Sequence, residues 1–379
     1  MPLDFSCSIT IPIYKSKPDY VEVASFKQAV KILNKYPFIL LCPENLNVSI
    51  YEKILKHSNI NYQFRFLDKK WFKGRNTYSS LFFQDFFYDL LETKFFLIYQ
   101  LDAWVFRDEL EYWCKKNYAF IGAPVFLSGG FYPFLNGGLS LRRVSKMKLA
   151  IKLLKYSIDV NMICGKFSFF EYKQIFEKKE WQKMPAEDHY FSFFASRFLD
   201  NYKIPKFEDS IKFSIESEND KLFNLNKKQL PFGVHAFERM EPWFWQKFVP
   251  VKFRLSNFKP IDDKSHKINL ILPRFTKNKS LYIWSAGLEG RYIFNELKNA
   301  NIIGFLDGNF ETWGRDCMGC KIFNPKEVLS DFKSLASSLY VIVGSFKYSK
   351  EIVKELKSYG LKKNKDFFVP FEGVKKNDQ

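Results

Sequence analysis

Short apolar runs alternate with stretches of helical periodicity through the N-terminal part of the chain. The apolar runs have the length of buried strands and span residues 7–14, 38–42, 62–66 and 95–101. The stretches between them carry apolar side chains at helical spacing and span residues 20–35, 49–57 and 77–91. This alternation predicts an α/β fold in which helices cover both faces of a mostly parallel sheet.

The last of these apolar runs ends at Gln100, Leu101 and Asp102, where the strand leaves the core. In open α/β sheets, ligands bind just beyond the carboxyl ends of the strands. A carboxylate in that place can hold a divalent cation against the phosphates of a substrate. Asp102 is therefore a candidate metal ligand, although an aspartate that only caps a turn gives the same pattern.

Two further segments carry candidate site residues. Asn136, Gly137 and Gly138 form a loop whose bare backbone a flat group can approach closely. Glu187 and Asp188 open a predicted helix over residues 187–199, where a carboxylate can act as general base toward an acceptor hydroxyl. The same two acids could instead cap that helix and interact favourably with its dipole.

His235 is one of four histidines in the chain and stands in an apolar loop, between Val234 and Ala236. A histidine in such surroundings is either a structural residue with satisfied hydrogen bonds or a metal ligand. In the second case its ring nitrogen would bind the same cation as Asp102.

Five segments, in this order, resemble a bacterial and fungal glycosyltransferase-like family that is catalogued as a domain of unknown function. They read IYQLDAWVFRDELEYWC, YAFIGAP, NGGLSLRR, AEDHYFS and LPFGVHAF, and the resemblance covers residues 5 to about 250. The family in turn resembles the GT-A glycosyltransferases, which bind a nucleotide-sugar and usually a divalent metal. The resemblance therefore implies a GT-A-like (nucleotide-diphospho-sugar transferase) mixed sheet.

The resemblance also implies roles for the candidate residues. Asp102 takes the place of the last aspartate of the DxD motif, and His235 resembles the late metal-binding histidine. Asp188 falls where inverting members keep their base, with Glu187 beside it. The implied cofactor is Mn²⁺ or Mg²⁺. The implied donor-binding residues are Pro12, Tyr14, Gln100, Asp102, Asn136, Gly137 and Gly138.

The chain departs from the family pattern at two places. The DxD motif is reduced to Gln100-Leu101-Asp102, which predicts weaker metal binding or none. The segment before the strand reads YSSL from Tyr78, where the family has Tyr-Asn-x-Leu, so recognition of the donor's base or ribose by this segment stays unassigned.

A second α/β unit is expected after a polar segment. Residues 1–255 are predicted as the GT-A-like domain, 256–279 as a linker and 280–379 as a small Rossmann-like accessory domain. Ser285, Gly287 and Gly290, with Asp307 at the next strand end, approximate a dinucleotide fingerprint. Because its first glycine is a serine, we expect docking or oligomerisation rather than cofactor binding.

The charge of the chain is concentrated in its first part. Residues 280–379 carry 15 Lys and Arg against 12 Asp and Glu, whereas the remainder carries 44 against 29. Such a surface favours anionic partners such as phosphate-bearing donors or anionic lipid, although a generally Lys-rich surface gives the same excess. No motif for nucleic-acid recognition accompanies the charge, so nucleic acid is not expected as a partner.

Together these features predict a glycosyltransferase that moves a sugar from a nucleotide-sugar, UDP-linked by preference, to a glycan or lipid-linked acceptor. We expect an inverting, metal-dependent enzyme of bacterial surface polysaccharide synthesis. Six scattered cysteines and the lack of a secretory pattern favour a cytoplasmic location. Peripheral membrane contact and homo-oligomerisation stay open. The alternative is a non-catalytic glycan-binding or scaffold protein with a degenerate GT-A domain.

Overall fold

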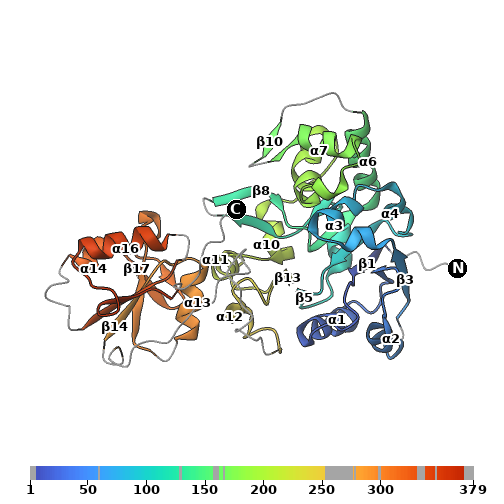
Figure 1. Cartoon of the computed structure of the whole chain (residues 1–379). Helices are drawn as coiled ribbons and strands as arrows, with labels where there is room; N and C mark the ends of the chain where they lie inside the picture. Colours follow the sequence, from blue (N-terminus) through green and yellow to red (C-terminus); the bar gives the residue numbers. More distant parts are fainter. Residues whose placement is uncertain are drawn as a thin grey trace. The chain divides into compact units, whose positions relative to one another are not determined.

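The chain forms two compact units, residues 1–240 with 244–253 and residues 241–243 with 254–379, each with its own sheet and core (Figure 1). A computed structural model describes residues 6–58, 60–127, 130–156, 162–164, 167–251, 276, 279–297, 300–330, 338–345 and 348–370. The predicted linker, residues 256–279, lies outside the described residues except for positions 276 and 279, so the domain boundaries remain a prediction.

The first unit is built on a six-stranded mixed sheet of order β3-β2-β1-β4-β9-β6. Its strands are β1 (Cys7–Pro12), β2 (Phe38–Pro43), β3 (Tyr62–Leu67), β4 (Phe95–Tyr99), β6 (Phe120–Ile121) and β9 (Leu139–Arg143). The first four are parallel to one another, and β9 runs antiparallel between β4 and β6. The predicted α/β class with a mixed sheet is therefore confirmed.

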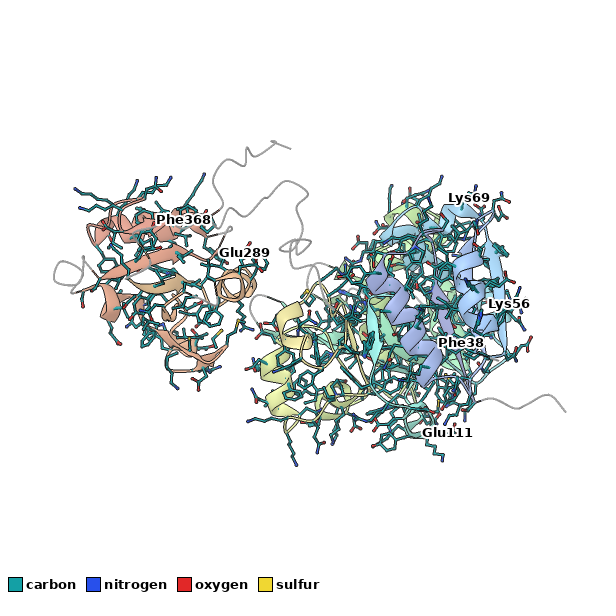
Figure 2. All side chains as sticks on the ribbon, turned by 90° about the horizontal axis from the view of Figure 1, so that it is seen from below. Phe38, Lys56, Lys69, Glu111, Glu289 and Phe368 are labelled. Atoms are coloured by element: carbon teal, nitrogen blue, oxygen red, sulfur yellow. The ribbon has the colours of Figure 1, made fainter. Side chains whose placement is uncertain are left out.

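Helices cover both faces of this sheet, because successive strand residues point to opposite sides. In β2, Phe38 and Leu40 enter one core, and Ile39 and Leu41 enter the other. Figure 2 shows Phe38 within the unit and Lys56 at its surface. The first core is covered by α1 (Tyr20–Ile32), α2 (Ser49–Lys56) and α5 (Leu110–Lys116). The second is covered by α3 (Arg75–Leu81), α4 (Asp85–Asp89), α6 (Val144–Tyr156) and α7 (Phe169–Glu177).

The structure corrects two of the predicted elements. The expected helix over residues 77–91 breaks between α3 and α4, which lets Phe82, Phe83 and Phe87 all enter the core. The apolar alternation of residues 211–215, which read IKFSI, predicts an extended segment. Most of them belong instead to α10 (Phe207–Phe213), and only β12 (Ser214–Ile215) is strand. Short apolar alternation does not separate these two possibilities.

A second, three-stranded sheet of order β12-β13-β5 lies in the same unit. It contains β5 (Ala103–Val105), which directly follows Asp102, and β13 (Gly233–His235). The remaining elements are the hairpins β7 (Pro124–Leu127) with β8 (Gly130–Leu135) and β10 (Ile163–Cys164) with β11 (Phe167–Ser168), and the helices α8 (Glu187–His189), α9 (Ala195–Phe198), α11 (Asn219–Leu225) and α12 (Pro242–Trp245). In the described residues, no helix is long and apolar enough to cross a membrane.

The second unit is Rossmann-like, with a sheet of order β16-β17-β15-β14-β18-β19. Its strands are β14 (Ser280–Trp284), β15 (Ile302–Leu306), β16 (Asp316–Cys317), β17 (Cys320–Phe323), β18 (Leu339–Val343) and β19 (Phe367–Phe368). Its helices include α13 (Leu288–Glu296), α14 (Pro325–Leu329) and α16 (Ser349–Ser358). A Cβ on Gly290 would stand 1.9 Å from the Ser285 carbonyl oxygen, so this glycine permits close packing of helix on strand.

Candidate functional site

A cavity of about 480 Å³ opens where β1 and β4 end. Four of the predicted donor-binding residues line it, namely Pro12, Tyr14, Gln100 and Asp102. Its size is within the usual range for small-ligand sites, and its place matches the rule for open α/β sheets. The parallel strands thus bring together residues that are far apart in the sequence.

Strand pairing places His235 beside Asp102. β5 pairs antiparallel with β13, so that His235 lies opposite Ala103, the residue after Asp102. His235 Nε2 is 3.3 Å from Asp102 Oδ1 and 3.2 Å from Gln100 Oε1. A Cβ on Gly138 would stand 2.0 Å from the same nitrogen, so the glycine loop leaves the space that the imidazole fills.

Glu216 holds the other side of the imidazole, with its Oε1 3.1 Å from His235 Nδ1. β12 pairs with β13, and this pairing brings Glu216, the residue directly after β12, to the ring. Burial lowers the pKa of His235, but the carboxylates of Asp102 and Glu216 outweigh that effect and raise it to about 10. Burial likewise raises the pKa of Asp102, while His235 and Arg239 bring it well below its usual range.

The donor atoms at this point suit a hard divalent cation. Asp102 and Gln100 supply oxygens, His235 supplies a nitrogen, and a carboxylate behind a histidine is the usual support for a metal-binding imidazole. In the described part of the chain, no three His, Cys, Asp or Glu side chains are grouped to hold a metal ion. A cation here would therefore be held by Asp102, His235 and the amide oxygen of Gln100. Substrate oxygens would have to supply its remaining ligands.

Cationic side chains also reach the cavity. Lys15, Arg75 and Arg239 line it, and the guanidinium of Arg239 forms an ion pair with Asp102 Oδ2. These charges suit the phosphates of a nucleotide-linked donor. Glu238 lines the same cavity, and its pKa is raised to about 7 by burial and by the nearby carboxylates of Asp19 and Asp102.

The predicted glycine loop lies behind the cavity and connects it with Asp188. Gly138 O accepts a hydrogen bond from Gln100 N at 3.0 Å, and Asn136 Oδ1 accepts one from Gly138 N at 2.7 Å. Asp188 Oδ2 accepts one from Gly137 N at 3.0 Å. The loop therefore couples the position of the candidate base to that of the candidate metal ligands.

Asp188 is buried at the start of an irregular helix. Its Oδ1 accepts a hydrogen bond from His189 N at 2.9 Å, and α8 continues through a π-helical turn, Tyr190–Phe194, into α9. Such turns are frequent at functional sites. Burial raises the pKa of Asp188 above its usual range, although the charges of Arg75 and Arg142 oppose that shift. The predicted helix over residues 187–199 is thus continuous but not regular.

Glu187 forms an ion pair with a fully buried arginine. Arg142 lies on β9 with its side chain stacked between Phe82 and Phe120, and its Nη2 is 2.7 Å from Glu187 Oε1. The same nitrogen donates to Gly137 O at 3.2 Å. Glu187 therefore acts on the glycine loop through Arg142, from the core side. Asp188 holds the loop directly, by accepting a hydrogen bond from the backbone N–H of Gly137.

Replacing Glu187 with glutamine should lower the free energy of unfolding by about 3–5 kcal/mol, because it leaves the buried Arg142 charge without its counter-charge. Denaturant unfolding would measure the loss. Glu52→Gln is the matched control, since its pair with Lys56 is exposed and should contribute little to stability. Equal losses in the two variants would contradict a structural role for Glu187.

Sequence reasoning missed Glu216, Arg142 and Glu238. Arg142 carried a signal, since a charged residue within the buried strand 139–143 needs a buried partner. Glu216 and Glu238 carried none, because both reach the site through contacts between segments that are distant in sequence.

The chain matches a family model described as "Protein of unknown function (DUF5672)" over residues 61–235. That match includes the predicted site residues from Gln100 to His235. The chain matches no curated protein.

Solved glycosyltransferase structures match the chain at low identity. Mouse xyloside xylosyltransferase 1, in its apo form, is 10% identical with a TM-score of 0.39, over 60% of this chain and 96% of that one. Glycosyltransferase GlyE of Streptococcus pneumoniae TIGR4 is 12% identical with a TM-score of 0.39, over 98% and 92%. Core-mannan synthase A (CmsA/Ktr4) of Aspergillus fumigatus, in a Mn/GDP form, is 8% identical with a TM-score of 0.36, over 50% and 69%. At these scores the assignment of a function rests on the residues of this chain.

Proposed function

We propose that this chain is a glycosyltransferase that moves a sugar from a nucleotide-sugar donor to a hydroxyl of a glycan or lipid-linked acceptor. The observation that carries the proposal is the convergence of Gln100, Asp102 and the buried His235, because Gln100 and Asp102 line a cavity that Arg75 and Lys15 also line. Oxygen and nitrogen ligands beside cationic side chains suit a diphosphate and its counter-ion. The mixed sheet and the sequence motifs support the same assignment.

The donor would lie across the ends of β1 and β4, with its diphosphate toward Arg75, Lys15 and Arg239. A divalent cation held by Asp102 and His235 would supply electrostatic stabilisation of the leaving nucleoside diphosphate. Arg239 must then share or leave its contact with Asp102 when donor binds, since it is paired with that carboxylate here.

The acceptor hydroxyl needs a base, and we assign that role to Asp188. Its raised pKa suits a group that must take up a proton near neutral pH. Transfer in one displacement with a carboxylate base would invert the anomeric centre. The preference for a UDP-sugar, the acceptor in a surface polysaccharide and the cytoplasmic location are parts of the same proposal and rest on the sequence resemblance.

A donor-hydrolysis screen across UDP-, GDP- and dTDP-sugars, with Mn²⁺, Mg²⁺ or EDTA, tests the proposal. We expect hydrolysis of at least one donor and stabilisation by its nucleoside diphosphate in a thermal-shift assay. Binding of glycans without turnover of any donor would favour the scaffold alternative instead. A nucleic-acid shift assay run beside it should be negative.

Glu216→Gln should weaken Mn²⁺ binding in the presence of nucleoside diphosphate by about 10–100-fold, because supporting carboxylates orient the metal-binding imidazole. Isothermal titration calorimetry measures this without any turnover. Glu208→Gln is a control with the same chemistry, because Glu208 is exposed on α10 and does not line the cavity. An unchanged Mn²⁺ affinity in Glu216→Gln would remove Glu216 from the site.

A further inference from the structure

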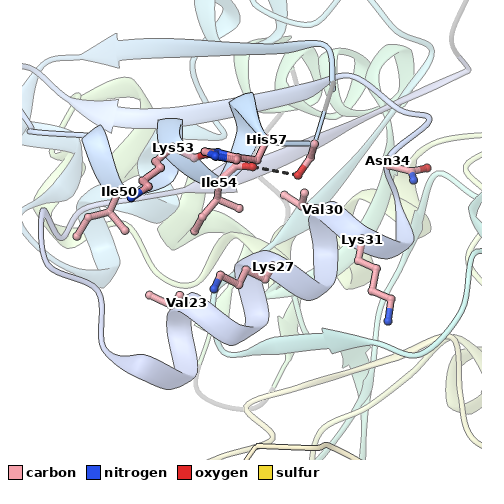
Figure 3. Close-up of a pocket in the computed structure, with 10 residues that line it drawn as sticks. Val23, Lys27, Val30, Lys31, Asn34, Ile50, Lys53, Ile54 and His57 are labelled. Carbon is pink, nitrogen blue, oxygen red and sulfur yellow. Dashed lines mark hydrogen bonds between the residues drawn. The ribbon is translucent and has the colours of Figure 1, made fainter.

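A larger cavity, of about 800 Å³, lies between α1 and α2 (Figure 3). Its apolar lining comes from Val23 and Val30 of α1 and from Ile50 and Ile54 of α2. Ile50 is 38% exposed, although it is a large aliphatic residue. A groove of this volume with an apolar lining has room for another molecule.

Three lysines line the same groove. Lys27 and Lys31 follow Val23 at helical spacing on α1, and Lys53 is on α2 (Figure 3). All three are exposed, and within the described ranges none of them forms an ion pair with a carboxylate. No acidic residue is among those that line the groove.

The lysines that border the groove are paired, in contrast to those that line it. Lys35, just after α1, is 2.7 Å from Asp108, and Lys56, at the end of α2, is 2.9 Å from Glu52. The groove therefore carries unneutralised positive charge beside apolar surface.

We propose that this groove binds an anionic phospholipid presented by a bilayer. The phosphate would contact Lys27, Lys31 and Lys53, and the apolar part of the lipid would lie against the valines and isoleucines. A soluble anion would use the charge but not the apolar lining, whereas a lipid uses both. Asp19, which caps α1, and Glu22 in its first turn line the smaller cavity, so one helix borders both sites. The inference does not depend on the proposed sugar transfer.

Flotation of the full-length protein with vesicles tests the proposal. The protein should bind vesicles that contain phosphatidylglycerol and should not bind vesicles of phosphatidylcholine alone. The triple variant Lys27→Gln/Lys31→Gln/Lys53→Gln should lower the partition coefficient about 100-fold, since each lysine near an anionic surface contributes about fivefold. The control triple variant Lys152→Gln/Lys178→Gln/Lys212→Gln makes the same change of charge on α6, at the end of α7 and on α10. Its partition coefficient should stay near that of the wild type.

A second arm tests the apolar lining. Ile50→Ser removes an exposed apolar side chain, so it should fold normally and yet bind the anionic vesicles more weakly. Inorganic phosphate is added as a competitor to distinguish a site for free phosphate from a site for lipid. Phosphate should displace the protein from the vesicles only if the apolar part of the lipid contributes nothing to binding. Equal losses in the groove and control triples, or no binding of wild type to the anionic vesicles, would overturn the inference. Thermal unfolding of each variant verifies that it is folded.

Discussion

Replacing Asp102 with alanine should lower the rate of sugar transfer by about 10²–10³-fold, the usual loss when one preorganised electrostatic group is removed from a reacting centre. The structure gives the reason, because Asp102 is the carboxylate on which His235 and Arg239 both converge. Without it, Glu216 is the one carboxylate left of the two that contact the imidazole, beside the Gln100 amide, and the cavity loses the acid that follows β4. Initial rates with the best donor of the screen measure the effect.

The same variant should also bind Mn²⁺ more weakly in the presence of nucleoside diphosphate, which calorimetry detects independently of turnover. Asp89→Asn is a suitable control, since Asp89 is on α4, pairs with Lys148 at 2.8 Å and does not line the cavity. Full, EDTA-resistant activity in Asp102→Ala would show that the proposed metal role is wrong.

Strand ends could be predicted from the sequence because buried strands leave a local signal. The apolar run 95–99 and its polar end placed Asp102 at the edge of a sheet, and the structure has β4 over those residues. The glycine loop was also local, since bare backbone is visible in the letters Asn-Gly-Gly. The physical reason for this loop was not visible in the local sequence. Gly138 leaves room for the imidazole of His235, which lies almost one hundred residues later in the chain.

The remaining parts of the candidate site depend on contacts that no local pattern encodes. β12 and β13 are separated by α11, and only their pairing brings Glu216 to His235. Glu187 and Asp188 are adjacent in sequence, yet one neutralises a buried arginine and the other binds backbone N–H groups of the glycine loop and its own helix. Tertiary packing therefore separates two acids that the sequence presents as equivalent.

Asp188→Asn should lower kcat by about 10²–10⁴-fold, because the amide keeps the size of the side chain but cannot take up the acceptor's proton. Donor affinity should change little. The wild-type rate should fall as pH drops toward the raised pKa of Asp188, since only the ionised carboxylate is a base. A kcat profile against pH measures this, and its acidic limb should be absent from the variant's residual activity.

The substitution also has a structural cost that must be separated from the chemical one. Asp188 accepts from two backbone N–H groups, and an amide has a single acceptor oxygen, so one of them loses its partner at about 1–3 kcal/mol. Ser192→Ala reproduces that cost nearby, because Ser192 Oγ accepts from Leu135 N at 3.0 Å and donates to the Asp188 backbone oxygen at 2.6 Å, while the Asp188 carboxylate stays in place. If Ser192→Ala lost as much turnover, Asp188 would be a positioning residue. If Asp188→Asn kept near-wild-type turnover, Glu238 would become the candidate base, because it lines the cavity and its pKa is raised to about 7. In that case Glu238→Gln would show the loss of turnover instead.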